Sequence, residues 1–293
     1  MSDIIASPST RRMALEQGVD IDARARELGR TTLGPEDIRA SAAARSSTAD
    51  TSYWDVDHAV YGPVTTEPMS RFAQIAAANL GAANALIPQV THHDRADISA
   101  IEGLRRAWKP EAQARGVKLT ALAFHVMALA KTLRAFPRFN ASLSPDGKTL
   151  TLKAYVHIGI AVDTPHGLMV PVIRNADHKG LWHLSAEITD LAARAQARKI
   201  KPDEMGGASM TISNLGGIGG TAFTPIVNPP ELAILGITRT EITTQWDANT
   251  PQPVPMAPLN LSYDHRALNG ADAARFMSHL TQLIAEPRQM IFE

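Results

Sequence analysis

The strongest constraint on the fold is a linker-like segment, SAAARSSTADTS at residues 41–52, that divides the sequence unequally. It is rich in Ala, Ser and Thr and has no periodic apolar pattern, which is typical of a linker. The 40 residues before it are too few for a large hydrophobic core of their own. The residues after it are enough for one large domain. The sequence therefore predicts a small N-terminal piece joined to one continuous α/β domain.

Composition excludes several classes of function. The 293 residues include 29 basic and 29 acidic side chains, so no basic field points to nucleic acid or to an anionic membrane. The absence of cysteine excludes disulfides, thiolate metal sites and cysteine nucleophiles, and it favours a reducing compartment. No segment has the ~20 apolar residues of a membrane span or the core of a signal peptide. We therefore expect a cytoplasmic protein without a metal, a nucleic-acid partner or a membrane partner.

Two short helices are predicted before the linker. Residues 7–9, Ser-Pro-Ser, open a run that ends at Gly18, a residue suited to a helix C-terminus. Gly-Pro-Glu-Asp at 34–37 opens another run that reaches about Ala44, and residues 19–21 are interpreted as an apolar bridge between the two helices. We predict a two-helix domain over residues 4–42, a linker over 43–59 and a larger domain over 60–293.

The larger domain combines helical and strand patterns. Helices are predicted from Asp97 or Ser99 to Trp108, from Thr120 to about Arg134, from about 184 to 198 and from about 271 to 285. Alternating apolar residues at 156–162, a turn at 163–167 and an apolar run at 168–173 predict a hairpin. Short strands are predicted at 209–212, 232–237 and 259–263.

A histidine follows the last predicted strand, in LNLSYDHRALNGAD from Leu259 to Asp272. The end of a strand is a position at which scaffolds often present catalytic groups. Neutral imidazole can take a proton from a thiol or an alcohol near pH 7, so His265 is a candidate general base. Asn269 is near enough to hold the local geometry. Taken alone, such a histidine is more often a structural hydrogen-bonding residue.

A serine ends another predicted strand, in MTISNLGGIGG at residues 210–220. The Ser213 hydroxyl can donate a hydrogen bond to an oxyanion during acyl transfer, although a strand followed by a glycine-rich turn needs no such function. Residues 217–222 also fit a loose dinucleotide-binding pattern, which requires a helix to start there. Three prolines, Pro225, Pro229 and Pro230, forbid that helix, so nucleotide binding is not expected.

A further histidine motif, HHDRAD at residues 92–97, matches the HHxxxD pattern of another group of acyl-transferring enzymes. The glycine that usually follows is missing, and Asp97 suits the start of the next helix. His265 is therefore preferred over His92 and His93 as the catalytic histidine. The sequence has no GxSxG, HExxH or GxxxxGK motif, so hydrolase, zinc-peptidase and P-loop functions lack their required residues.

These motifs together resemble one family. DHRALNGADAARF is similar to the HxxxDG signature that closes the catalytic domain of dihydrolipoamide acyltransferases, the E2 components of 2-oxo acid dehydrogenase complexes. The resemblance covers residues 60–293 and includes IPQVTHHDRADI, PRFNASLS, HIGIAVDTPHGLMVPVI and TISNLGGIGGTAFTPIVNPPELAILGI. The glycine-rich stretch and PRFNASLSPDGKTLTLK are most similar to bacterial pyruvate dehydrogenase E2, so acetyl is the expected acyl group. The N-terminal piece resembles the peripheral subunit-binding domain that tethers E1 or E3.

The resemblance implies an α/β fold like that of chloramphenicol acetyltransferase, with a mixed sheet, assembled as a homotrimer with active sites between subunits. His265 would deprotonate the attacking thiol, Ser213 of the neighbouring chain would stabilise the oxyanion, and Asn269 would orient the histidine region. Coenzyme A and a dihydrolipoyl arm would enter a channel from opposite ends. Residues 288–292 resemble the hydrophobic end that docks trimers into large hollow cores, or they simply seal the last helix.

Two departures concern the site and its substrate. Asn269 stands where most of the family has aspartate; a salt bridge to a nearby arginine would become a hydrogen bond, and we expect activity to survive. The first lysine in the sequence is Lys109, so we expect no lipoyl domain before the binding domain. The lipoyl arm is therefore expected from another polypeptide, in trans.

The N-terminal piece departs further. Arg11 falls where the family has a partner-binding arginine, but Leu15 and Thr32 stand at two other arginine positions, and Arg-Glu-Leu at 26–28 replaces a GTG turn. Leucine and threonine cannot pair with acidic partner residues, so E1 or E3 binding does not follow from the resemblance. The piece is retained only as a fold, or it binds a different partner.

Three functions remain open. The first is an acyltransferase that uses lipoyl groups supplied in trans, and the second is a non-catalytic structural core subunit of a 2-oxo acid dehydrogenase complex. The third is acyl transfer from coenzyme A to a small molecule, which the fold alone does not exclude. Ser213 and His265 favour catalysis, because a scaffold needs neither. The altered N-terminal piece and the missing lipoyl domain favour the scaffold.

Overall fold

The computed structural model describes residues 4–16, 18–39, 54–165 and 167–291. Contacts group the chain into two compact units, Met1–Pro68 and Met69–Glu293. Among the described residues, no helix is both long enough and apolar enough to cross a membrane.

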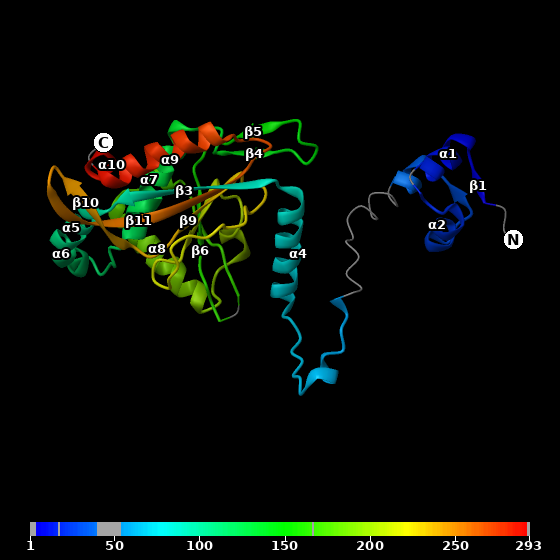
Figure 1. Ribbon diagram of the computed structural model, residues 1–293, viewed down its shortest axis with the longest axis horizontal. Helices are drawn as coiled ribbons and strands as arrows, with labels where there is room; N and C mark the ends of the chain where they lie inside the picture. Colours follow the sequence, from blue (N-terminus) through cyan, green and yellow to red (C-terminus); the bar gives the residue numbers. More distant parts are fainter. Residues whose placement is uncertain (1–3, 17, 40–53, 166, 292–293) are drawn as a thin grey trace. The chain divides into compact units, whose positions relative to one another are not determined.

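The smaller unit consists of short helices and one pair of very short strands (Figure 1). Its elements are α1 (Pro8–Glu16), α2 (Ile21–Leu28), a helical segment at 35–39, the 3-10 helix η2 (His58–Tyr61), and β1 (Ile5–Ala6), which pairs in parallel with β2 (Thr32–Leu33). Ala14, Val19 and Ile38 form its buried apolar cluster. This cluster is small, as the length of the piece predicts.

The sequence predicts the first helix of this unit correctly but misses α2. The first helix stops before Gly18, whose φ of 63° is the left-handed conformation that ends helices. Residues 19–21, predicted as a bridge, instead start α2, because the Asp20 carboxylate accepts two backbone N–H groups of the first turn at 2.8 and 3.1 Å. The helix predicted from residue 34 is present over 35–39, and its predicted end at Ala44 lies outside the described residues.

The larger unit contains the predicted mixed sheet. Its strands are β3 (Gln89–Asp97), β6 (Ile158–Ala161), β7 (Val172–Ile173), β8 (Met210–Asn214), β9 (Ala233–Ile237), β10 (Glu241–Asp247) and β11 (Thr250–Asp264), and a separate pair is formed by β4 (Ala141–Leu143) and β5 (Leu150–Leu152). The order is β10-β11-β9-β8-β6-β7, with β3 paired to β11. β8 runs parallel to β6 and β9, whereas β11 is antiparallel to its three partners.

Helices cover this sheet and extend from its edges (Figure 1). They are α4 (Arg71–Leu86), α5 (Ser99–Ala107), α6 (Lys109–Ala114), α7 (Ala121–Ala135), α8 (Leu181–Gln196), α9 (Gly270–Ala285) and α10 (Arg288–Ile291), with the 3-10 turns η3 (Ala176–His178) and η4 (Pro202–Glu204). The predicted helices are confirmed as α5, α7, α8 and α9, and the predicted hairpin is the antiparallel pair β6–β7. Met290 of α10 is buried in the chain's own core, so this tail does seal the last helix; Phe292 lies outside the described residues.

β11 is much longer than the strand predicted at 259–263. Its first half contains Pro251, Pro253 and Pro255, each directly opposite a residue of β10. Successive residues of a strand direct their backbone N–H groups to opposite edges of the strand. Prolines two residues apart therefore all lack an N–H group on the same edge. The Pro255 oxygen accepts the Ile98 backbone N–H at 3.0 Å, so this edge faces away from β10 and the prolines are compatible with that pairing.

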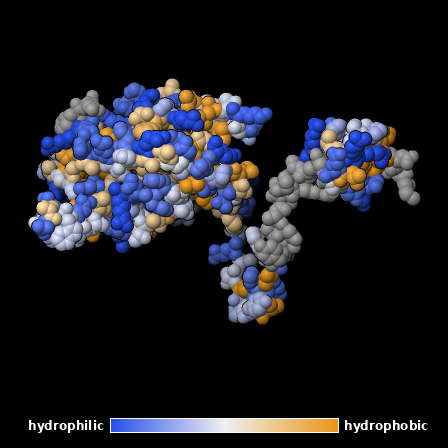
Figure 2. Space-filling model, turned by 45° about the horizontal axis from the view of Figure 1, so that its top comes forward, coloured by the Kyte–Doolittle hydropathy of each residue, from blue (hydrophilic) through white to orange (hydrophobic). Residues whose placement is uncertain are grey.

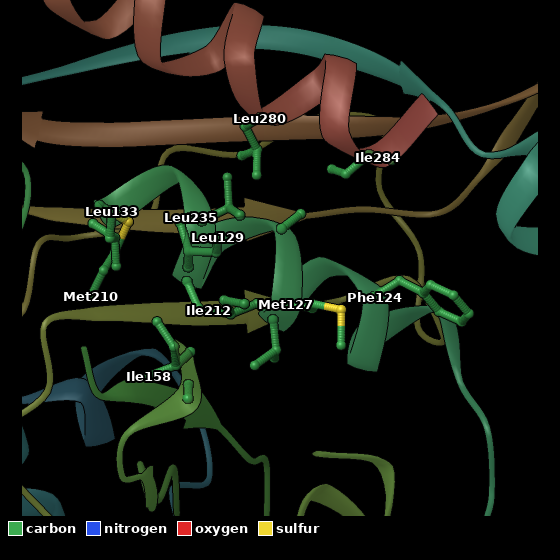
Figure 3. Close-up of a cluster of buried hydrophobic side chains, with 14 of the residues drawn as sticks. Phe124, Met127, Leu129, Leu133, Ile158, Met210, Ile212, Leu235, Leu280 and Ile284 are labelled. Atoms are coloured by element: carbon green, nitrogen blue, oxygen red, sulfur yellow. The ribbon is translucent and has the colours of Figure 1, made fainter. Parts of the chain in front are cut away.

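The main core lies between one face of the sheet and helices α7, α8 and α9. Figure 3 shows Leu129 and Leu133 of α7 close to Met210 and Ile212 of β8, with Leu280 of α9 nearby. A much smaller cluster, formed by Ala83 of α4 and by Ile87, Val227 and Ile234, lies on the other face. That second face is covered by few helices, and it carries the first candidate site residue.

Candidate active site

Ser213 lies on the sheet face opposite to the main core. Side chains alternate along a strand, so Met210 and Ile212 point into the core while Thr211 and Ser213 point to the other face. Ser213 is half-buried in the single chain. Its position near the carboxyl end of β8 leaves the hydroxyl available to a group that approaches this face.

The segment after β8 is irregular. The Asn214 side chain accepts the Gly216 backbone N–H at 2.9 Å, which closes a turn. Residues 215–232 contain no helix, as the prolines predict. The loose dinucleotide pattern therefore lacks the helix N-terminus that it needs.

His265 lies in the turn between β11 and α9. The buried Asp264 carboxylate accepts the Arg266 backbone N–H at 3.0 Å and two guanidinium hydrogen bonds, from Nε at 3.0 Å and from Nη2 at 2.7 Å. The His265 backbone N–H donates to the Pro88 oxygen at 3.1 Å, and its ring lies 5.8 Å from that of Tyr263. The backbone of the turn is thus held on both sides, while the imidazole is exposed in the single chain.

Asn269 acts as the N-cap of α9. Its side-chain oxygen accepts the Asp272 backbone N–H at 2.9 Å, and its backbone oxygen accepts that of Ala273 at 3.0 Å. The predicted hydrogen bond to an arginine stays a prediction, and the contact observed within the chain is this helix cap. Asn269 therefore fixes the point at which the His265 turn becomes a helix.

Within one copy, Ser213 and His265 lie at opposite ends of the sheet. Ser213 pairs with Gly236 of β9, and Gly236 pairs with Asn260 of β11. His265 comes five residues after Asn260, which at ~3.3 Å per residue places it roughly 17 Å farther along the sheet. A hydrogen bond spans about 3 Å, so one copy cannot bring both side chains to the same substrate atom. Within one copy, His265 and Asn269 lie on the same turn, whereas Ser213 lies far from both.

The family is decided by a match along most of the chain. Residues 61–292 match the family model described as 2-oxoacid dehydrogenases acyltransferase (catalytic domain). The chain belongs to this family. Over 98% of its length it is 45% identical to the dihydrolipoyllysine-residue acetyltransferase component of the pyruvate dehydrogenase complex of Azotobacter vinelandii, of which the match covers 47%. It spans about half the length of the first curated relatives that it matches.

Solved structures agree with this assignment. The dihydrolipoamide acetyltransferase of Azotobacter vinelandii aligns with a TM-score of 0.79 and 51% identity, covering 80% of this chain and 97% of that one. It was solved in a crystallographic and enzymatic investigation of a serine, a histidine and an asparagine in its catalytic mechanism. A structure of the cubic core of the pyruvate dehydrogenase multienzyme complex matches with the same TM-score, identity and coverage.

In this 2-oxo acid dehydrogenase acyltransferase domain, a buried acid lies near the start of the serine strand. Glu231 Oε1 accepts hydrogen bonds from Thr211 Oγ1 at 2.9 Å and from Asn228 Nδ2 at 3.0 Å, while its Oε2 is buried without a hydrogen-bond partner. Burial raises the pKa of Glu231 to about 7, against the opposing effects of these hydrogen bonds and of Lys153. Because Thr211 lies on the same face as Ser213, this network helps to fix the serine strand.

Replacing Glu231 with glutamine should remove a pH-dependent loss of stability. The Glu231 carboxyl has a pKa of 4.5 in the unfolded chain and about 7 in the folded chain, so the folded chain binds this proton more tightly. The protonated carboxyl therefore contributes fully to stability below pH 4.5, and this contribution is lost as the pH rises through 7. Between pH 5 and 8, the free energy of unfolding of Glu231→Gln should gain roughly 2 to 3 kcal/mol relative to the unmodified protein. Urea unfolding at both pH values measures this difference, and a difference independent of pH would contradict the assignment.

The HHxxxD residues do not form one site. His92 and His93 point to opposite faces of β3, and the Asp97 carboxylate accepts the Ser99 backbone N–H at 2.7 Å, as predicted for the start of α5. His93 Nδ1 lies 2.7 Å from Asn260 Oδ1, a contact that sequence reasoning missed. Within the described part of the chain, no group of three or more His, Cys, Asp or Glu residues could hold a metal ion.

In the smaller unit, Arg11 is engaged within its own chain. Its guanidinium donates to the backbone oxygens of Ile4 at 2.7 Å and Ala6 at 3.3 Å. Leu15 on the same helix is 84% exposed, and residues 26–28 belong to α2. At residue 15, for which the resemblance implies an arginine, this surface therefore presents an apolar side chain.

Proposed function

We propose that this chain transfers an acetyl group between a dihydrolipoyl group and coenzyme A. The observation that carries the proposal is the order and spacing of Ser213, His265 and Asn269. In the numbering of the Azotobacter vinelandii enzyme, the investigated serine, histidine and asparagine are separated by the same intervals. Identical residue types at identical intervals, in a chain 51% identical over the aligned region, support the same roles here.

His265 acts as the general base. Its neutral imidazole takes the proton of the coenzyme A thiol, and the sulfur attacks the carbonyl carbon of the acetyl-dihydrolipoyl thioester. Ser213 donates its hydroxyl hydrogen bond to the oxyanion that forms. The bond between carbon and the dihydrolipoyl sulfur then breaks, and the proton on His265 passes to that sulfur. Acetyl-coenzyme A and the dihydrolipoyl thiol are the products, and Asn269 positions the turn without touching either.

Each active site takes Ser213 from one copy and His265 from another. The proposal is supported by the sheet register, which separates the two residues within one copy. It is also supported by α4, a mostly apolar helix whose residues Phe72, Ile75 and Leu86 are 38%, 53% and 69% exposed in the single chain. Large apolar side chains exposed together on one helix need a cover, and a second copy supplies one. Figure 2 shows other hydrophobic residues, in orange, among hydrophilic ones on the surface of the larger unit.

We propose that the assembly is a homotrimer, the smallest closed ring in which each copy gives a serine to one neighbour and a histidine to the other. The match to a cubic core supports association of these trimers into a larger hollow core. The substrates are coenzyme A and a lipoyl group that is attached outside residues 1–108, which contain no lysine.

The domain roles follow from the same resemblance. Residues 60–293 are the acyltransferase core, residues 43–59 are a linker, and residues 4–42 are a degenerate peripheral subunit-binding domain. We expect E1 or E3 binding to be weak, because the exposed Leu15 supplies no cation to an acidic partner and the Arg11 guanidinium already makes two hydrogen bonds within its own chain.

Acetyl transfer from acetyl-coenzyme A to free dihydrolipoamide tests this function. We expect turnover by the purified, assembled protein, with propionyl, isobutyryl and succinyl donors transferred more slowly. No turnover with any of these donors in a correctly assembled protein would contradict catalysis and would favour the structural core subunit.

A further inference from the structure

A row of four residues crosses the sheet face opposite to the main core, from Ser213 to the outer strand β3. Residues directly opposite each other on neighbouring strands have side chains on the same face. Ser213 is opposite Gly236, Gly236 is opposite Asn260, and Asn260 is opposite His93. Neighbouring strands are ~4.8 Å apart, so the row measures roughly 14 Å from Ser213 to His93.

The far end of the row is a histidine in a fixed orientation. Asn260 is 1% exposed, its Nδ2 donates to the Gly236 backbone oxygen at 3.3 Å, and its Oδ1 lies 2.7 Å from His93 Nδ1. Because the amide oxygen can only accept, His93 Nδ1 is the donor in this contact. Nε2 of the neutral ring is therefore an acceptor, on a side chain that is exposed in the single chain.

The middle of the row is apolar. A Cβ added at Gly236 would lie 2.6 Å from two ring carbons of Phe223, so the ring sits directly over this glycine. Phe223 thus lies between the Ser213 hydroxyl and the His93 imidazole. Along the row, this face presents a hydrogen-bond donor (the Ser213 hydroxyl), then the aromatic ring of Phe223, then a hydrogen-bond acceptor (His93 Nε2).

This order matches the chemistry of a thiol-bearing arm. In a dihydrolipoyl amide the amide nitrogen lies up to nine bonds from the acylated sulfur, roughly 10 Å when extended, with methylene groups between them. The pantetheine arm of coenzyme A carries amides at three and seven bonds from its sulfur. Adding about 3 Å for a hydrogen bond gives a reach close to the length of the row.

Resting on the proposed function, we propose that His93, held by Asn260, binds the amide N–H of the thiol-bearing arm whose thioester faces Ser213. Phe223 contacts the apolar part of the same arm. His93 is thus a substrate-binding residue on the serine side of the site, and Asn260 is its positioning residue. Both lie on the copy that contributes Ser213.

Steady-state kinetics of His93→Ala test the proposal, with KM measured separately for coenzyme A and for dihydrolipoamide. Loss of one hydrogen bond should raise one KM about five- to tenfold with kcat almost unchanged, because the contact is present in both ground and transition states. The KM that rises identifies the arm. His92→Ala, on the opposite face of the same strand, is the matched control and should leave both KM values within about twofold. Unchanged KM values for both substrates in His93→Ala would overturn the proposal.

A substrate change isolates the hydrogen bond. If dihydrolipoamide is the affected arm, dihydrolipoic acid methyl ester, which has no N–H, should show the same KM with the unmodified protein and with His93→Ala. If coenzyme A is the affected arm, a thiol substrate without an amide should show the same KM with the unmodified protein and with His93→Ala. Asn260→Leu should raise the same KM as His93→Ala, and the double variant should add little. An equal KM increase for substrates with and without the N–H would overturn the contact.

Failure of the proposed function gives a different result. Without turnover by the unmodified protein, calorimetric titration with coenzyme A and with dihydrolipoamide still reads the contact directly. Weaker binding of one of them to His93→Ala than to the unmodified protein would support the contact, and equal Kd values for both would overturn it.

Discussion

Replacing His265 with alanine should lower the rate of acetyl transfer by about 10²–10⁴-fold, the usual contribution of a general base. The imidazole is exposed in the single chain, and the turn that carries it is held by backbone contacts and by the pairing of Asp264 with Arg266. The variant should therefore fold and assemble normally. The measurement is kcat with acetyl-coenzyme A and dihydrolipoamide, together with Tm and the molecular mass of the assembly.

A histidine elsewhere on the surface provides the control. His183 on α8 has a 65% exposed side chain, and His183→Ala should keep the rate of the unmodified protein. A rate for His265→Ala within tenfold of the unmodified protein, in an intact assembly, would remove His265 from the role of base.

Replacing Ser213 with alanine should lower kcat by about 10²–10³-fold, as loss of one oxyanion donor does in related chemistry. KM should change little, because the hydroxyl binds the oxyanion much more strongly than the thioester oxygen of the ground state. Ser142→Ala, a half-buried serine on β4, is the matched control and should leave kcat unchanged. An increase in KM with an unchanged kcat would place Ser213 in substrate binding instead.

Local patterns predict much of this fold. α7 and α9 follow from long apolar stripes with clear ends, and the β6–β7 hairpin follows from alternation on both sides of a turn. The patterns fail where the decisive contact is made elsewhere in the chain. The first half of β11 contains prolines that argue against a strand, and only its pairing with β10 shows why they are tolerated. α2 is missed because Asp20 was interpreted as part of a bridge, not as a helix cap.

The candidate site shows the same limit. The sequence singles out Ser213 and His265 by residue type and by position at strand ends. It does not show that the sheet holds them apart, because strand register depends on pairing between distant segments. The Asp264–Arg266 pair and the contact between His93 and Asn260 were missed for the same reason. The HHxxxD pattern predicts no role for His93, because the catalytic interpretation of that pattern does not fit this sequence.

The central claim is that Ser213 and His265 of different copies form one acyl-transfer site, and subunit exchange tests it most directly. Equal amounts of His265→Ala and Ser213→Ala protein, each inactive alone, are dissociated together and reassembled. Random mixing pairs an intact serine with an intact histidine at about a quarter of the interfaces, so we expect about a quarter of the activity of the unmodified protein. No activity above that of the two variants alone, in assemblies shown by differential tags to contain both chains, would contradict the shared site.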